Sequence, residues 1–177
     1  MAAIEIGRKS APKRLVIIAD AGPLIVLSRI GQLSLLRRVY GEVWITETVH
    51  AEIIGGRNKI RFLGQDDLIL ALSQWLHVTS IDMDGWQARN PGVDAGEASS
   101  ICLAERHPNS LLILDDRNGR REAHNRGIRT VGVLSVILRA KQVGLISAGL
   151  PVAQALVAQG YFVSAGLLEQ FKAMLDE

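Results

Sequence analysis

Short apolar runs alternate along the chain with stretches in which apolar residues recur every three or four positions. LVIIAD (15–20), EVWIT (42–46) and LLILDD (111–116) contain consecutive apolar residues, a pattern typical of strands covered on both faces in a parallel sheet. HVTSID (77–82) alternates like a further strand. Residues 129–133 complete a predicted set of five strands.

Helical spacing fills the segments between these strands. Pro23 suits the first position of a helix, and Leu24, Leu27 and Ile30 follow it at helical spacing. Further helices are predicted over residues 33–40, 46–54, 67–76, 94–106, 117–126, 134–143, 148–158 and 164–175. Because strands alternate with helices, the sequence predicts an α/β fold in which helices cover both faces of a parallel sheet.

Composition and charge limit the class of protein. The 177 residues suffice for one domain, 21% of them are charged, and no apolar run approaches the roughly 20 residues that span a bilayer. The single cysteine, Cys102, cannot form an internal disulfide. We therefore expect a cytoplasmic protein that does not bind membranes. Its predicted parts are a basic arm over residues 1–14, a main domain over 15–145 and a helical extension over 146–177 packed on that domain.

Acidic residues stand where two predicted strands end. Asp20 closes the first apolar run, and Asp115 and Asp116 close the fourth strand. Functional sites of such folds lie at the carboxyl ends of the strands, so these acids meet if the two strands are neighbours. Glu52, near the end of one predicted helix, and Glu97, in the first turn of another, have a route to the same edge.

Each of these acids also has a purely structural explanation. Asp94 and Glu97 have the spacing of a capping box, which we favour as the role of Asp94. Glu97 falls on the packed side of its helix, between Ile101 and Ala104. Asp20 has a possible turn-capping role, and an exposed glutamate such as Glu52 is commonplace on a helix.

Carboxylates gathered at one edge need a compensating charge. Two of them about 4 Å apart repel by roughly 4 kcal/mol at an effective dielectric of about 20, so a cluster takes up protons or a cation. Oxygen ligands select Mg²⁺ or Mn²⁺, and such ions are suited to phosphodiester cleavage. The histidines show no metal-binding spacing; they are His50, His77, His107 and His124.

Other chemistries have less support in the sequence. No dinucleotide-binding or P-loop glycine motif is present. A haloacid-dehalogenase type phosphatase requires a second aspartate at the position of Gly22. Ser28 and Cys102 have no recognisable base partner, so neither is a strong candidate nucleophile.

Arginines are concentrated just after the fourth strand. Arg117, Arg120, Arg121, Arg126 and Arg129 fall within thirteen residues, although the formal net charge of the whole chain is only +2. A solvated helix face explains this cluster by itself. Guanidinium groups also form bidentate pairs with phosphate oxygens, so Arg117, Arg120 and Arg121 are candidate contacts to a nucleic-acid backbone.

Several motifs recur together in one known family. They lie in VIIADAGPLIVLSRIGQLSLL, VWITETVHAEI, VDAGEASSICLAE, LLILDDRNGRREAHNRGIRTVGVLSVILRAKQVGLI and LVAQGYFVSAGLLEQFKAML. With its D-x-x-PLI, GEA and DD-R motifs, the chain resembles PIN-domain proteins, most closely small prokaryotic PIN-like predicted nucleic-acid-binding proteins related to VapC-type toxins. The resemblance extends over nearly the whole chain after residue 14.

The resemblance implies a three-layer α/β/α fold and a Mg²⁺- or Mn²⁺-dependent ribonuclease, often the toxin of a toxin–antitoxin pair. The family's acids correspond to Asp20, Glu52, Glu97 and Asp116, with Asp115 adjacent to the last. Gly22 stands where many members have serine or threonine, and Glu97 where many have aspartate.

Our leading hypothesis is therefore an endoribonuclease. Asp20 and Asp116 would hold the ion, with Asp115 as a further candidate ligand, while Glu97 completes the site and Glu52 acts directly or through water. The expected partners are an RNA substrate, an antitoxin protein and a second copy of the chain in a homodimer. Two alternatives remain open: a catalytically inactive PIN-like module that binds RNA or protein, and another Mg²⁺-dependent phosphoryl-transfer enzyme acting on a small substrate.

Overall fold

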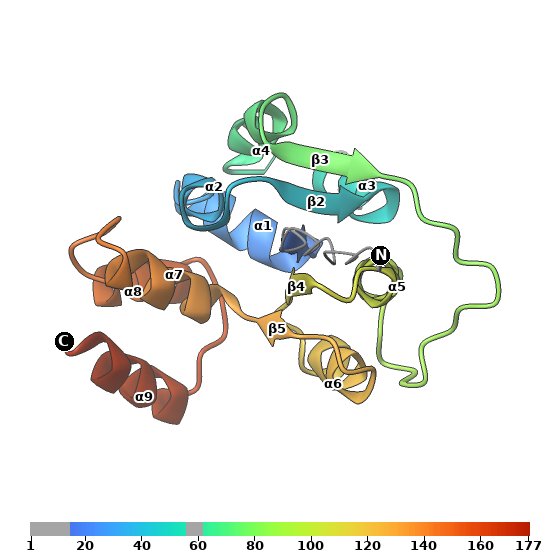
Figure 1. The fold of residues 1–177 in the computed structure, drawn as a ribbon. Coiled ribbons are helices and arrows are strands. Elements are labelled where there is room, and N and C mark those ends of the chain that lie inside the picture. Colours follow the sequence, from blue (N-terminus) through green and yellow to red (C-terminus); the bar gives the residue numbers. More distant parts are fainter. Residues whose placement is uncertain (1–14, 56–61) are drawn as a thin grey trace, which may run out of the picture.

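The computed structural model describes residues 15–55 and 62–177, so the predicted basic arm over 1–14 lies outside the described residues (Figure 1). These residues form a parallel sheet in the order β3-β2-β1-β4-β5. Its strands are β1 (Val16–Ala19), β2 (Val43–Thr46), β3 (Leu76–Thr79), β4 (Ser110–Ile113) and β5 (Thr130–Val131). The predicted α/β fold with a central parallel sheet is confirmed.

Helices follow the strands in alternation, as predicted. They are α1 (Ala21–Arg29), α2 (Ser34–Tyr40), α3 (Glu47–Gly55), α4 (Gln65–Leu72), α5 (Ala95–Arg106), α6 (Arg117–Asn125), α7 (Val133–Gln142), α8 (Leu150–Ala158) and α9 (Ala165–Leu175). None of the described helices has the length and apolar character needed to cross a membrane.

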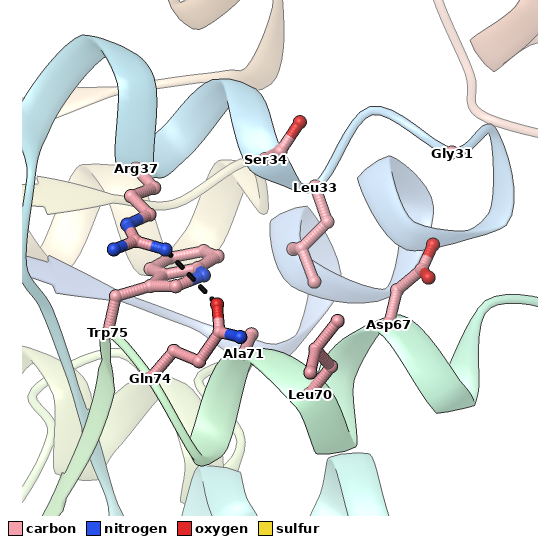
Figure 2. A pocket seen from close by; sticks show the side chains of 9 residues that line it. All are labelled: Gly31, Leu33, Ser34, Arg37, Asp67, Leu70, Ala71, Gln74 and Trp75. Atoms are coloured by element: carbon pink, nitrogen blue, oxygen red, sulfur yellow. Dashed lines mark hydrogen bonds between the residues drawn. The ribbon is translucent and has the colours of Figure 1, made fainter.

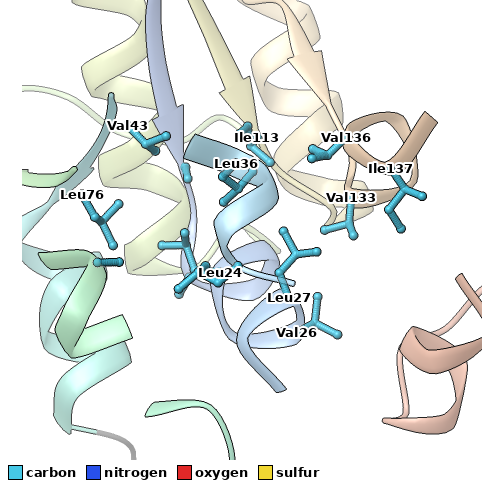
Figure 3. Close-up of a cluster of buried hydrophobic side chains, with 14 of the residues drawn as sticks. Leu24, Val26, Leu27, Leu36, Val43, Leu76, Ile113, Val133, Val136 and Ile137 are labelled. Carbon is cyan, nitrogen blue, oxygen red and sulfur yellow. The ribbon is translucent and has the colours of Figure 1, made fainter. Parts of the chain in front are cut away.

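The two faces of the sheet pack against different helices, which gives three layers. Ile17 and Ala19 of β1 join the larger apolar cluster, whose members come from α1 to α4 and α7 to α9. Figure 3 shows part of this cluster, with Leu24, Leu36 and Ile137 packed near the strands. Ile18 points to the opposite face and packs with α5 and α6 in a second cluster. This alternation is what a strand buried on both faces requires.

Pairing between β1 and β4 positions the candidate site. Val16 pairs with Ser110 and Ala19 with Ile113, and the Asp20 N–H continues the pairing by donating to the Ile113 carbonyl oxygen at 3.0 Å. The strands are therefore neighbours and end at the same level. Asp20 and the acids after β4 consequently lie at one carboxyl edge.

Several predicted helix boundaries differ from the observed ones, and two of the differences have a clear physical reason. The first helix begins at Ala21 rather than Pro23, because Asp20 caps it directly; Pro23 occupies the third position, where its missing N–H is still tolerated. Helix α4 ends at Leu72 instead of residue 76. Leu76 leaves the helical pattern because it begins β3, where it pairs with Val43.

The C-terminal helices share the core of the main domain. Phe171 and Leu175 of α9 and Leu156 of α8 are buried in the same cluster as β1. The last residue, Glu177, adds polar contacts, because its carboxylate accepts from the Gly149 and Leu150 amides at 2.9 Å. Residues 146–177 are thus anchored by apolar packing as well as hydrogen bonds.

Candidate active site

Asp20 connects the end of β1 to the start of α1. Its side chain is only 8% exposed, and Oδ2 accepts from the Gly22 N–H at 3.4 Å. Oδ1 is buried and accepts no hydrogen bond from any described residue. The turn-capping role considered for Asp20 is therefore real, yet it satisfies only one of the two oxygens. A buried carboxylate oxygen without a partner is costly and requires an explanation.

Glu97 lies in the first turn of α5, where it closes the predicted capping box. The Asp94 side chain accepts from the Glu97 N–H at 2.9 Å, and Glu97 Oε2 accepts from the Asp94 N–H at 3.2 Å. Glu97 is 5% exposed, as its place on the packed side of the helix predicts. The sequence analysis favoured a capping role for Asp94. Its negative charge also raises the pKa of both Asp20 and Glu97.

Asp116 caps α6 at the same edge. Its Oδ1 accepts from the Asn118 and Gly119 amides at 2.6 and 3.1 Å. A Cβ atom at Gly119 would lie 3.1 Å from Cδ of Glu97, so the start of α6 closely approaches the Glu97 carboxylate. The structure therefore brings Asp116 and Glu97 together.

Glu52 reaches the site from α3. A Cβ atom at Gly96 would lie 2.5 Å from Glu52 Oε1, which places this carboxylate against the first turn of α5. The negative charge of Glu52 also raises the pKa of Asp20. The lack of a side chain at Gly96 is thus what lets Glu52 come close to the other acids.

Burial and mutual repulsion raise the affinity of this group for protons. Desolvation raises the pKa of Asp20 to about 7 against the opposite effect of backbone hydrogen bonds, and repulsion from Asp94 and Glu52 adds a smaller increase. Desolvation likewise raises the pKa of Glu97 to about 7, with repulsion from Asp94, Asp116 and Asp20. No ion pair within residues 15–55 and 62–177 involves Asp20 or Glu97.

The donor chemistry of this group fits a hard divalent cation. All the candidate ligands are carboxylates, and Oδ1 of Asp20 is a buried acceptor without a partner. In the described part of the chain, however, no three acidic, histidine or cysteine side chains are grouped tightly enough to form a finished metal site. Metal binding therefore requires side-chain adjustment, for which the exposed Asp116 has room.

Asp115 does not face the other acids. Its Oδ1 accepts from the Val133 N–H, the first residue of α7, at 3.0 Å, and its Oδ2 is buried without a hydrogen bond of normal geometry. Burial raises the pKa of Asp115, while the nearby Tyr161 hydroxyl and Arg120 guanidinium act in the opposite direction. Consecutive residues of an extended chain point to opposite sides, which separates Asp115 from Asp116.

The candidate RNA-binding arginines all lie on α6, with different surroundings. Arg117 and Arg121 are exposed next to the acidic edge. Arg120 is exposed as well, but its guanidinium lies near Asp115, because a Cβ atom at Gly132 would be 3.0 Å from Arg120 Nη1 and 2.6 Å from Asp115 Oδ1. Arg120 therefore belongs to the surroundings of Asp115.

A buried ion pair, which the sequence analysis missed, holds the long connection before α5 in place. Glu122 is 1% exposed and accepts from the Arg89 and Asn90 amides at 3.0 and 3.1 Å and from Arg126 Nε at 2.7 Å. The Arg126 guanidinium also stacks 4.3 Å from the centre of the Trp86 ring. The Glu122–Arg126 spacing of four residues on a predicted helix was the available signal.

A different hollow lies between α2 and α4 (Figure 2). It has a volume of about 250 Å³, and Arg37 crosses it to donate to Gln74 at 3.1 Å. This hollow lies near the amino ends of β2 and β3, because Trp75 in its wall immediately precedes β3. Ligands of open α/β sheets bind at the opposite edge, so this hollow is not the candidate active site.

A parallel sheet between helical layers, with acids from several elements at its carboxyl edge, defines an α/β protein with an acidic candidate site. The sequence model of the PIN domain matches residues 16–177. The chain therefore belongs to the PIN-domain family, whose members are generally metal-dependent nucleases. This match confirms the resemblance noted from the sequence. No curated protein and no solved structure matches the chain.

Proposed function

We propose that this PIN-domain protein is a divalent-metal-dependent endoribonuclease. The observation that carries the proposal is the pair Asp20 and Glu97, two buried carboxylates that repel one another and have no described cationic partner. Keeping both ionised at neutral pH requires a positive charge from outside the chain. A divalent cation supplies that charge, and the family makes a nuclease role for it the natural choice.

Asp20, Glu97 and Asp116 are the proposed ligands, and Glu52 supports the site from α3. A bound Mg²⁺ or Mn²⁺ ion supplies an activated water and stabilises charge on phosphate oxygens. The chain itself contributes orientation. Helices α1 and α6 both begin at this edge, and helix N-termini favour phosphate groups.

Arg117 and Arg121 extend the phosphate-binding surface along α6. Both side chains are exposed, so they are accessible to a nucleic-acid backbone. Guanidinium groups bind phosphate oxygens in pairs, which would fix the direction of the RNA across the acids.

An RNA cleavage assay tests this proposal. The wild-type protein should cleave RNA with Mn²⁺ or Mg²⁺ and lose activity with a chelator or with Asp20→Asn. Asp84→Asn, which changes an exposed residue in the connection before α5, is the matched control and should keep full activity. Cleavage that survives chelation or Asp20→Asn would refute the proposal.

An inactive PIN-like binding module is the second candidate function. Gly22 occupies the place of the usual serine or threonine, and no finished metal site is present in the described part of the chain. RNA binding without cleavage under all metal conditions would favour this candidate.

The toxin role and the predicted partners are proposals of the same kind. If the protein is a toxin, its induction should arrest growth and Asp20→Asn should abolish the arrest. A co-expressed antitoxin protein should relieve it. Light scattering would test the proposed homodimer directly.

A further inference from the structure

A cavity of about 210 Å³ lies between α7 and α9. Its walls are largely apolar and include Leu134, Leu138, Leu167 and Phe171. Leu167 is 43% exposed, so one side of the cavity is accessible from solvent. Apolar walls of this kind suit a flat, weakly polar group.

The other end of the cavity is polar and lies at the carboxyl edge of the sheet. Asp115 follows the end of β4, and Gly132 follows β5 directly; both line this end together with Arg120 and Tyr161. The Tyr161 hydroxyl interacts with the Asp115 carboxylate, yet Oδ2 is buried without a hydrogen bond of normal geometry. A ligand that donates a hydrogen bond would satisfy it, while Arg120 offers donors beside it.

We propose that this cavity receives one base of the RNA, whose edge donates an N–H group to Asp115 and accepts from Arg120. The inference rests on the proposed function, because it places the base next to a phosphate held at the acidic site. Asp115 of the cavity and Asp116 of the acidic site are consecutive residues, so the two places adjoin along the chain.

Charge favours RNA over a peptide as the occupant. Helix α6 begins beside the acids and its Arg120 lines the cavity, so the exposed Arg117 and Arg121 of the same helix can bind the phosphates on either side of an inserted base. Bases of single-stranded RNA are commonly turned out of the strand, stacked on aromatic or guanidinium groups and hydrogen-bonded at their edges. Tyr161 brings an aromatic ring to the cavity wall, and Arg120 brings donors for the edge of the base.

Asp115 also predicts which bases fit. Cytosine presents its exocyclic amino donor next to the N3 acceptor, so it can donate to Asp115 and accept from Arg120 side by side, whereas uracil has an acceptor (O4) and a donor (N3–H) at the same two places. We expect a short oligouridine with one central cytidine to bind about tenfold more tightly than oligouridine alone. Asparagine at this position both donates and accepts, so Asp115→Asn should reduce that preference and still accept from the Val133 N–H.

The first experiment measures RNA binding without cleavage. Fluorescence anisotropy of the two labelled oligonucleotides, with wild-type protein in EDTA, gives the base preference directly. Equal preference in the wild type and in Asp115→Asn would overturn the inference. Because no cleavage is needed, a chain that fails the nuclease assay but keeps the preference would refute only the proposed function.

A second pair of variants tests the cavity itself. Ser135 is exposed at the cavity, so Ser135→Trp should block it without disturbing the core and should remove the cytidine preference. Gln142→Trp, two turns along the same helix and away from the cavity, is the control and should retain the preference. Identical behaviour of the two variants would overturn the inference. A co-purifying polypeptide lost only in Ser135→Trp, with unchanged RNA preference, would identify a protein-binding slot instead and would also overturn it.

Discussion

Replacing Asp20 with asparagine removes one buried charge and keeps an oxygen for the Gly22 N–H. We predict that this substitution stabilises the metal-free protein. The pKa of Asp20 rises from 3.8 to about 7 on folding, and each unit corresponds to about 1.36 kcal/mol. The ionised carboxylate therefore destabilises the fold by up to about 4 kcal/mol, a penalty that asparagine does not carry.

The sign of the pH dependence follows from proton binding. Between about pH 4 and pH 7 the folded protein holds a proton on Asp20 that the unfolded chain has released. This contribution to stability is present at low pH and is lost as the pH rises to about 7. The advantage of Asp20→Asn should thus be small at pH 4 and below and nearly complete at pH 8.

Thermal unfolding measures this difference. A change of about 4 kcal/mol corresponds to an increase in Tm of about 8 °C or more for a chain of this size. At pH 8 with EDTA, Asp20→Asn should melt higher by about that amount, and Asp84→Asn should match the wild type. Added Mn²⁺ should stabilise the wild type by mass action and close the gap. An Asp20→Asn protein that melts at or below the wild-type temperature at pH 8 in EDTA would refute the electrostatic argument.

Three further substitutions probe other parts of the site. Glu97→Gln keeps an acceptor for the capping box but loses the charge, so the initial rate of RNA cleavage in Mn²⁺ should fall about 10- to 100-fold, while the melting temperature at pH 8 in EDTA should not fall, because burial raises the pKa of Glu97 to about 7; an unchanged rate would contradict its role. Gly96→Ala should displace the Glu52 carboxylate, lowering the cleavage rate while stability changes by less than about 1 kcal/mol, and full activity would show that this position of Glu52 is unimportant. Arg126→Ala should lower the free energy of unfolding, measured with urea, by about 3–5 kcal/mol, because it leaves Glu122 buried without its cation. A decrease of less than about 1 kcal/mol would contradict the importance of the buried pair.

The fold was largely predictable because its strands are short apolar runs buried on both faces. The runs ending at Asp20 and Asp116 predicted β1 and β4. Their pairing was compatible with the sequence and is observed in the structure. Errors arose where tertiary contacts decide a boundary. Pro23 gave no sign that Asp20 is the cap, so that the helix begins at Ala21, two residues before Pro23. Nothing in the local sequence showed that Leu76 pairs with Val43.

The site was predictable in part for a different reason. Acids at strand ends identify an edge of the sheet, but not the direction of each side chain. The orphaned oxygen of Asp20 and the approach of Glu52 to Gly96 depend on how α1, α3 and α5 pack. The glycine in the first turn of α5 was the only local signal of that approach, because glycine inside a helix often marks a close contact.

The pleat of one short segment accounts for two separate polar environments. Leu114 still pairs with the Val131 carbonyl, so the chain remains extended as it leaves β4, and Asp115 and Asp116 turn to different layers. One acid consequently joins α7, α9 and the apolar cavity, whereas the other caps α6 beside Glu97. Because α6 begins directly after the two acids, its arginines are within reach of both environments. Under the two proposals, Asp116 holds the metal ion that binds a phosphate on one side and Asp115 orients a base on the other, which a single carboxylate cannot do.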